Sequence, residues 1–176
     1  MNKDCRYCQK IFSGKEKVYE DEKVVAVLSD SPSAYGHIIL MPKEHYPIME
    51  QVPDFIINHI FRIANKISIA AFEALHVQGT NLLVNNGIAA GQDSAHFMIH
   101  IIPRREGDGL NLQWTPKQLS EEEMSTVELQ LKENAKTIGQ FQKEKTAPIE
   151  IRDTKEKIES KPGEESYLLR KVRRIP

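Results

Sequence analysis

The chain has 176 residues, of which 40% are hydrophobic and 28% are charged, and its formal net charge is -1. This composition supports a single buried core with a short appendage, and the charge balance gives no reason to expect nucleic acid or an acidic membrane as a partner. Residues 1–5 lack the apolar core of a secretory signal, and no run reaches the roughly 18 uninterrupted apolar residues of a membrane span. We therefore expect a cytoplasmic protein.

The first half of the chain is expected to form three strands and one long helix. Residues 17–20 and 23–28 have the pattern of a hairpin around residues 21–22, and residues 37–41 are a mostly apolar run typical of a buried strand. From Pro53 onward the apolar residues recur with the period of a helix. The positions on its apolar side are Ile56, Ile60, Ile63, Ile67, Ala70 and Ala74.

The second half is expected to contribute two more strands and a second helix. Residues 80–85 and 96–102 are predicted to be strands, and residues 86–92 form a loop with two glycines. The second helix should begin at Ser120, because Ser120 and Glu123 have the spacing of a capping box. Its apolar positions are Met124, Val127, Leu131, Ala135 and Ile138, with Gly139 as a suitable stop.

Residues 142–176 differ in composition from the rest of the chain. They are rich in Lys, Glu and Asp, and the residues after Tyr167 are basic with apolar interruptions. We interpret residues 1–141 as the folded domain and residues 142–176 as a charged extension, partly ordered at best, in which residues 148–152 could form a strand. The basic end could contact nucleic acid phosphates, but a short basic terminus is more often simply solvated.

The most informative segment is the predicted strand that begins at His96. Side chains two residues apart share a face of a strand, so His96, Met98 and His100 should point one way. Phe97 and Ile99 should point the other way. Two imidazoles on one face of an apolar strand are costly unless each finds a hydrogen bond, a metal or a substrate. The pattern therefore favours a functional site over a purely structural pair.

Two cysteines, Cys5 and Cys8, lie three residues apart near the N-terminus. They are too few and too close for the disulfide framework of a secreted protein. This spacing is only moderately specific, because two unrelated thiols, a redox pair or half of a zinc site would all produce it.

Residues 91–104 resemble the signature of the histidine triad family, in which three histidines alternate with apolar residues. The resemblance covers about residues 4–140 and implies an α+β fold, with an antiparallel sheet of about five strands and two main helices. It also implies a homodimer, with Trp114 either near the partner's pocket or in the core. Other matching segments occur in family order: Cys5–Cys8, Gly36-His37, Pro42–His45, Asn81–Gly87 and Gly107–Gly109.

The family's chemistry is transfer or hydrolysis at a nucleotide α-phosphate, and the middle histidine of the triad is the nucleophile. In this chain the matching position is Met98, whose thioether would form an unstable sulfonium at phosphorus. Met98 could mark a pseudoenzyme that binds purine nucleotides without cleaving them, or an engineered substitution. Alternatively, His100, Asp93 or His37 could activate water for hydrolysis of a nucleoside phosphoramidate or a dinucleoside polyphosphate. We favour loss of the covalent route. A non-catalytic module that recruits a partner through its tail is a third alternative.

The resemblance also assigns nucleotide contacts residue by residue. His100 matches the histidine that contacts the phosphate, and His37 matches the one that orients the active-site imidazole. Asn85 and Gln92 match side chains near the phosphate, and the loop amides around them could also bind an anion.

Two positions depart from the family pattern. Ser29 stands where the family has an Asp or Asn for the ribose hydroxyls, so either Ser29 makes a weaker contact or the adjacent Asp30 replaces it. Asp93 stands where the family often has Ser or Thr. A carboxylate at this position would repel a phosphate unless it were protonated or paired.

One branch of the family holds a structural zinc ion. The matching ligand positions in this chain are Cys5, Cys8, His45 and His96. Thiolate and imidazole groups are the usual ligands of structural zinc, so the resemblance implies a zinc site with a structural role. His96 would then be unavailable for catalysis.

Overall fold

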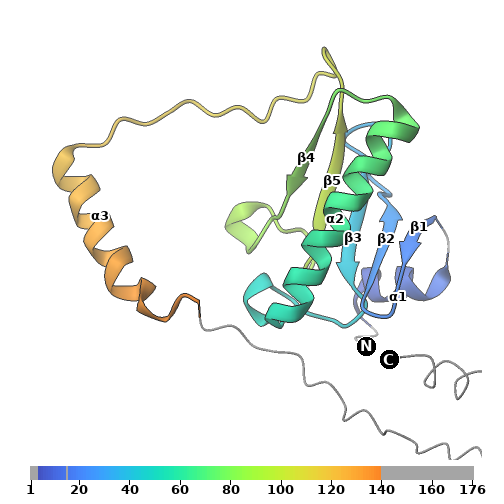
Figure 1. Cartoon of the computed structure of the whole chain (residues 1–176), viewed down its shortest axis with the longest axis horizontal. Helices are drawn as coiled ribbons and strands as arrows, with labels where there is room; N and C mark the ends of the chain where they lie inside the picture. Colours follow the sequence, from blue (N-terminus) through green and yellow to red (C-terminus); the bar gives the residue numbers. More distant parts are fainter. Residues whose placement is uncertain (1–3, 15, 140–176) are drawn as a thin grey trace, which may run out of the picture. The chain divides into compact units, whose positions relative to one another are not determined.

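The computed structural model describes residues 4–14 and 16–139, and these residues form an α+β fold (Figure 1). Five strands make one open antiparallel sheet in the order β1-β2-β3-β5-β4, which confirms the predicted fold class. The strands are β1 (Lys17–Glu20), β2 (Val24–Leu28), β3 (Ile38–Pro42), β4 (Gly79–Leu83) and β5 (Ile99–Arg104), and the helices are α1 (Arg6–Ser13), α2 (Asp54–Leu75) and α3 (Glu121–Asn134). Short 3-10 turns occur at Met49–Gln51, Ile88–Ala90 and Ala135–Thr137.

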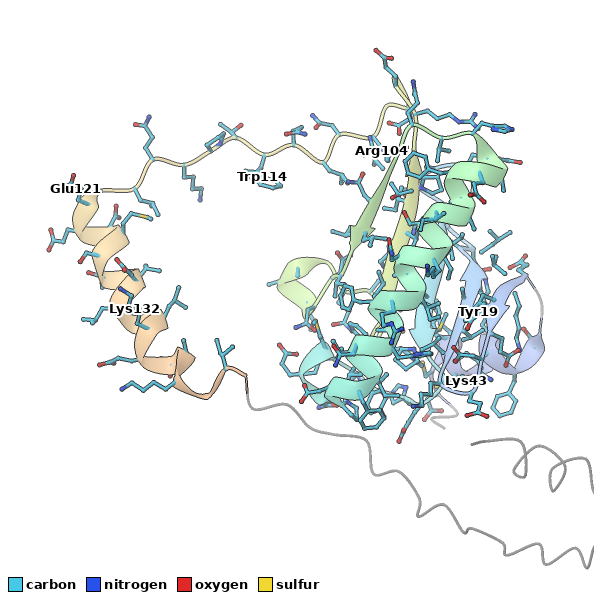
Figure 2. All side chains as sticks on the ribbon, in the orientation of Figure 1. Tyr19, Lys43, Arg104, Trp114, Glu121 and Lys132 are labelled. Atoms are coloured by element: carbon cyan, nitrogen blue, oxygen red, sulfur yellow. The ribbon has the colours of Figure 1, made fainter. Side chains whose placement is uncertain are left out.

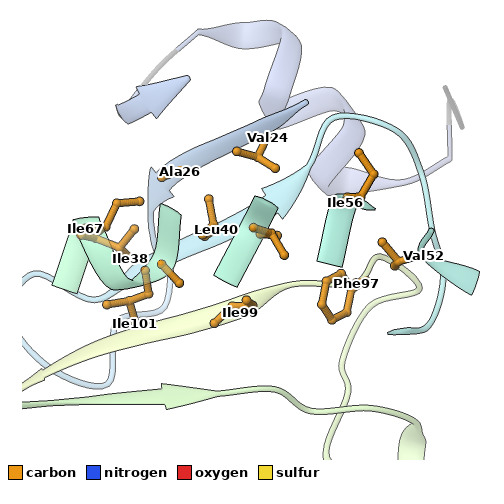
Figure 3. Packing of buried hydrophobic residues seen from close by; sticks show 12 residues of the cluster. Val24, Ala26, Ile38, Leu40, Val52, Ile56, Ile67, Phe97, Ile99 and Ile101 are labelled. Atoms are coloured by element: carbon orange, nitrogen blue, oxygen red, sulfur yellow. The ribbon is translucent and has the colours of Figure 1, made fainter. Parts of the chain in front are cut away.

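The long helix α2 covers one face of the sheet and forms the main hydrophobic core with it (Figure 3). Its buried side is rotated from the predicted one, because Ala70 and Ala74 are exposed while Ala64 and Ala71 are buried. The spacings between the buried positions are four, four, three and four residues, close to the 3.6-residue period of a helix, and this keeps one side facing the sheet. The buried positions are Ile56, Ile60, Ala64, Ile67 and Ala71.

The opposite face of the sheet is covered by α1, a helix that the sequence analysis missed. Tyr7, Cys8 and Ile11 are its buried residues, and their spacing of about one helical turn was the available signal. Gly14 ends the helix in the left-handed conformation, which costs glycine little. The cluster beneath α1 contains Cys5, Tyr7, Cys8, Ile11, Val25, Val27, Ile39, Met41 and Met98.

The third helix, α3, begins as predicted. The Ser120 hydroxyl accepts a hydrogen bond from the Glu123 amide, and the Glu123 carboxylate accepts one from the Ser120 amide, so the capping box is formed. The expected apolar side is not covered, because no residue of α3 is buried. Glu121 and Lys132 mark this helix in Figure 2. The α-helix ends at Asn134, and a 3-10 turn replaces the last expected turn.

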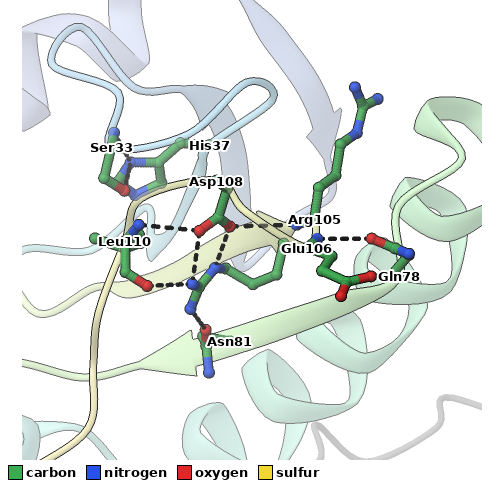
Figure 4. A network of polar contacts seen from close by, with 9 residues as sticks. Ser33, His37, Gln78, Asn81, Arg105, Glu106, Asp108 and Leu110 are labelled. Carbon is green, nitrogen blue, oxygen red and sulfur yellow. Dashed lines mark hydrogen bonds and ion pairs between the residues drawn. The ribbon is translucent and has the colours of Figure 1, made fainter.

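A polar network fixes the chain where it leaves β5 (Figure 4). The Arg104 guanidinium donates to both carboxylate oxygens of Asp108, at 2.6 and 2.9 Å, and to the Asn81 side chain of β4 at 2.6 Å. It also donates to the Leu110 carbonyl. The Arg104 partner holds the pKa of the Asp108 carboxyl well below its usual range. The turn that follows β5 is therefore anchored to β4.

Several expectations lie outside the described residues. They include the charged extension at residues 142–176, with its expected strand at 148–152 and its basic end. Within the described ranges, no helix has both the length and the apolar character that crossing a membrane requires.

Candidate functional site

The segment that carries the histidines enters the sheet later than predicted, because β5 begins at Ile99 and not at His96. The Phe97 amide donates to the Tyr46 carbonyl at 2.6 Å, and this bond holds the segment before the strand in place. The side chains nevertheless alternate as expected: Phe97 joins the core under α2, and Met98 joins the cluster under α1. The first part of the histidine motif is therefore an extended segment rather than a sheet strand.

Four predicted metal ligands meet at the α1 side of the sheet. Their ligand atoms all lie within 4.8 Å of one another, although they come from three separate parts of the chain. Two of the sulfur-to-nitrogen pairs are Cys8 Sγ to His45 Nδ1, at 3.4 Å, and Cys5 Sγ to His96 Nδ1, at 3.5 Å. The cluster is Cys5, Cys8, His45 and His96.

The geometry of this cluster fits zinc. In a tetrahedron with a Zn–S distance of about 2.3 Å and a Zn–N distance of about 2.0–2.1 Å, sulfur and nitrogen lie roughly 3.5–3.6 Å apart. The third pair, Cys8 Sγ to His96 Nδ1, is 3.6 Å apart. The other ring nitrogen of His96 donates to the Pro42 carbonyl at 3.0 Å, which leaves Nδ1 as the ligand atom. These residues have the composition, spacing and supporting hydrogen bond of a structural zinc site.

A second pair of histidines consists of His37, directly before β3, and His100, the second residue of β5. His37 Nε2 and His100 Nδ1 are 3.1 Å apart, and the two ring centroids are 5.2 Å apart. The Ser33 amide donates to His37 Nδ1 at 3.1 Å (Figure 4). Because an amide can only donate, Nδ1 of His37 is an acceptor and its proton resides on Nε2. His37 therefore donates to His100 Nδ1, and the proton of His100 resides on its own Nε2.

Both histidines of this pair are neutral at pH 7. Burial, together with the neighbouring His100, lowers the pKa of His37 to about 4. Burial also lowers the pKa of His100, although the nearby Asp93 carboxylate acts in the opposite direction. A neutral His100 with its hydrogen on Nε2 is a hydrogen-bond donor suited to a phosphate oxygen.

A small cavity of about 170 Å³ brings together several residues of the predicted nucleotide site. This volume is sufficient for a phosphate group. The side chain of Gln92 braces the loop beside it, accepting from the Gly87 amide at 2.8 Å and donating to the carbonyls of Pro47 and Ser94. The side-chain amide of Gln92 therefore serves to hold the loop in place. The lining residues are Asn85, Gly91, Gln92, Asp93, Met98 and His100.

The two expected ribose residues lie in different surroundings. Asp30 lines a groove beside α1 with Lys10, whose ammonium group is 2.5 Å from its carboxylate. Ser29 lines a separate apolar cavity that α2 also borders, and its hydroxyl accepts from the Ser31 amide at 3.2 Å. Ser29 shares its cavity with His37, to whose carbonyl the Ser29 amide donates at 2.9 Å, whereas the Asp30 carboxylate is paired with Lys10.

The structure adds two cations to the site that the sequence analysis did not select. Arg6 is 2.7 Å from the Asp93 carboxylate, and Lys10 pairs with Asp30. They are four residues apart on α1, a spacing that places both on one side of the helix. That spacing was visible in the sequence, but only the expectation of a helix there could have drawn attention to it. Trp114 is 83% exposed (Figure 2), which rules out the core position considered for it.

The chain matches the HIT domain family over residues 13–107, which is more than half of its length. It therefore belongs to the HIT, or histidine triad, family. Among its relatives, adenylylsulfatase HINT3 of Arabidopsis thaliana is 41% identical over 113 residues. That alignment covers 62% of this chain but only 57% of the plant protein, so the chain spans little more than half of this relative.

Solved structures of the family share the fold. A HIT family member from Bacillus subtilis is 33% identical with a TM-score of 0.67, over 74% of this chain and 96% of that one. A zinc-bound histidine triad family protein from Mycobacterium smegmatis is 28% identical with a TM-score of 0.59, over 75% of this chain and 97% of that one.

Proposed function

We propose that this protein binds a purine nucleoside monophosphate, such as AMP or GMP, and does not form the covalent intermediate of the active family members. The observation that carries the proposal is the ordered pair of neutral histidines beside a phosphate-sized cavity. Ser33 orients His37, His37 orients His100, and His100 is left with an Nε2 hydrogen to donate to a phosphate oxygen. The adenylyl substrate in the name of the plant relative supports a nucleotide of this kind.

The proposed lack of covalent chemistry rests on Met98. Met98 is buried and lines the same cavity as His100, where a nucleophile would face the phosphorus atom. A thioether has no proton to lose and makes a poor phosphoryl acceptor. The other candidate bases are already engaged: Asp93 is paired with Arg6, both ring nitrogens of His37 have hydrogen-bond partners, and Nδ1 of His100 accepts from His37 while its Nε2 carries the proton. These contacts argue against a fast water-activating route as well.

Isothermal titration with AMP and GMP tests the binding proposal. We expect binding by the parent protein and an affinity roughly 10- to 100-fold lower in His100→Ala, because a hydrogen bond to a charged phosphate is lost. His59→Asn is the matched control, since His59 is a half-buried histidine that pairs with Asp21 on the opposite side of the sheet. Equal losses in the two variants, or no binding by the parent, would contradict the proposal.

Turnover of an adenosine phosphoramidate tests the missing nucleophile. Substituting Met98→His should raise the single-turnover rate by about 100-fold or more, the scale on which removal of a nucleophile acts in other enzymes. A covalent nucleotidyl adduct should be detectable by mass spectrometry in that variant alone. An equally fast parent protein would show that another group supports catalysis.

We further propose that Cys5, Cys8, His45 and His96 hold a structural zinc ion. Zinc would tie α1 to the segment before β5, so its role would be to keep α1 over the nucleotide site. A reducing compartment such as the cytoplasm would keep both thiols available to the metal. Metal analysis of the purified protein should find one zinc per chain, and none in Cys8→Ser.

We also propose that the protein forms a homodimer through β4 and α2. β4 is an edge strand, and an uncovered edge readily pairs with a second chain. Large apolar side chains are exposed beside that edge: Phe61, Phe72, Leu82 and Leu83. Light scattering should report a dimer for the parent protein and a shift toward monomer for Leu82→Lys.

A further inference from the structure

An ion pair links α1 to the loop that borders the candidate phosphate cavity. Arg6 Nη2 lies 2.7 Å from Asp93 Oδ2, although the two residues are 87 positions apart in the chain. Asp93 lines the cavity that also contains His100 and Met98. The pair therefore joins the first turn of α1 to the place where a phosphate would bind.

This ion pair changes the main obstacle to nucleotide binding at the site, which is the negative charge of Asp93. The Asp93 carboxylate stands next to the phosphate cavity, and two negative charges a few ångström apart repel each other. A cation on Asp93 removes most of that repulsion. An arginine can also bind a second anion, because its guanidinium has five N–H donors and one carboxylate needs only some of them.

Arg6 is held in position for this task by its neighbours. It lies between Cys5 and Tyr7, both of which are buried in the cluster under α1. Its guanidinium carbon is 4.7 Å from the centre of the Tyr7 ring, and Nη2 also donates to the Tyr7 hydroxyl at 2.9 Å. The Arg6 side chain is 63% exposed and thus accessible to a ligand, and these contacts reduce the conformational freedom that it loses on binding.

We propose that Arg6 determines the phosphate affinity of this protein. Its guanidinium neutralises Asp93, which lines the phosphate cavity, and would donate its remaining N–H groups to a phosphate bound beside Asp93. Arg6 and Asp93 form one charge-compensated unit at a position where an uncompensated carboxylate would exclude the ligand. The inference rests on the proposed nucleotide function and names how this chain achieves it.

Lys10 provides a natural comparison within the same helix. It lies one turn after Arg6 and pairs with Asp30 at 2.5 Å and Glu16 at 3.1 Å. Lys10 and Asp30 line a groove beside α1, and neither residue lines the phosphate cavity that contains Asp93 and His100. A change at Lys10 should affect AMP and adenosine alike, whereas a change at Arg6 should affect only the ligand that carries a phosphate.

The test measures the affinities of AMP and adenosine in matched variants whose zinc content and thermal unfolding show an intact fold. Arg6→Ala should weaken AMP binding about tenfold, because the bare Asp93 carboxylate then faces the phosphate, and leave adenosine binding unchanged. Arg6→Lys should restore part of the AMP affinity. Asp93→Ser should bind AMP at least as tightly as the parent, and Arg6→Ala combined with Asp93→Ser should recover most of the loss. Lys10→Ala should change the two affinities by the same factor.

The outcomes separate this proposal from the nucleotide function itself. If the parent binds AMP and Arg6→Ala binds it equally well, the role of Arg6 is refuted while nucleotide binding stands. Losses that simply add in the double variant, or an equal loss of adenosine binding in Arg6→Ala, would make Arg6 a purely structural residue. If neither the parent nor Asp93→Ser binds AMP, both the nucleotide function and this inference fall.

Discussion

The two faces of the sheet are built from the same strands but differ in chemistry. Among the residues that the structure describes, the side chains buried under α2 are apolar, and most of them form one continuous cluster. The face under α1 also buries an apolar cluster, but it includes Cys5 and Cys8, and it carries both buried histidines, His37 and His96. Apolar burial is favourable without further conditions, whereas a buried polar group costs free energy unless it finds a partner.

This difference indicates that the two faces of the sheet have separate roles. The face under α2 supplies stability through packing, which depends little on the exact identity of each side chain. The face under α1 holds groups whose partners must be placed accurately: the Cys5, Cys8, His45 and His96 cluster, the His37–His100 pair and the Arg6–Asp93 ion pair. If the two faces have separate roles, changes to the face under α2 should affect stability, and changes to the face under α1 should affect binding and metal content.

The largest expected effect is loss of the proposed zinc ion from the face under α1. Structural zinc contributes about 10–16 kcal/mol in small zinc-dependent peptides, and we expect an appreciable part of such a contribution here. Cys8→Ser, or treatment with a strong chelator, should release α1 and lower the unfolding temperature steeply. Calorimetry with metal analysis checks this, and a zinc-free protein of unchanged unfolding temperature would contradict it.

A change in the core under α2 should be smaller and should leave the metal in place. Ile60 is fully buried in the middle of α2. Ile60→Ala should cost about 2–5 kcal/mol of unfolding free energy through lost burial and a new cavity. Denaturant unfolding measures the loss, and zinc content should remain at the parental value. Loss of zinc from a protein that is still folded would show that the faces are not independent.

The pH dependence of stability should report the buried histidine pair. The pKa of His37 is about 4 in the folded protein and near 6.5 in an unfolded chain, so between these values the unfolded chain binds more protons. The free energy of unfolding should therefore fall as the pH drops from about 6.5 to about 4. His37→Gln should have a shallower slope than the parent over this window. Equal slopes in the two proteins would show that His37 does not contribute.

The smallest effect is expected for a conservative change at Met98. Met98→Leu keeps the volume and apolar character of a buried side chain and should cost less than about 1.5 kcal/mol. AMP affinity should stay within a few-fold of the parent, since Met98 supplies no hydrogen bond. A large loss of affinity without a loss of stability would mean that the thioether itself contacts the ligand.

The sequence by itself determined the elements that rest on local periodicity and capping. The hairpin, the buried strand β3, the helix α2 and the capping box of α3 follow from patterns within a few residues. The four ligands of the metal cluster were also identified, because resemblance to a family reports which distant positions meet.

Tertiary structure alone decided the features that depend on contacts between distant segments. The pairs Arg6–Asp93 and Lys10–Asp30 join residues 87 and 20 positions apart, and the expected repulsion at Asp93 is removed only by the first of them. The local sequence pattern also did not predict that the Gln92 side chain holds its own loop in place. Nor did it predict that the apolar side of α3 is exposed. Local sequence restricts backbone conformation, but the charge and burial that a side chain experiences are set by whatever the completed fold places beside it.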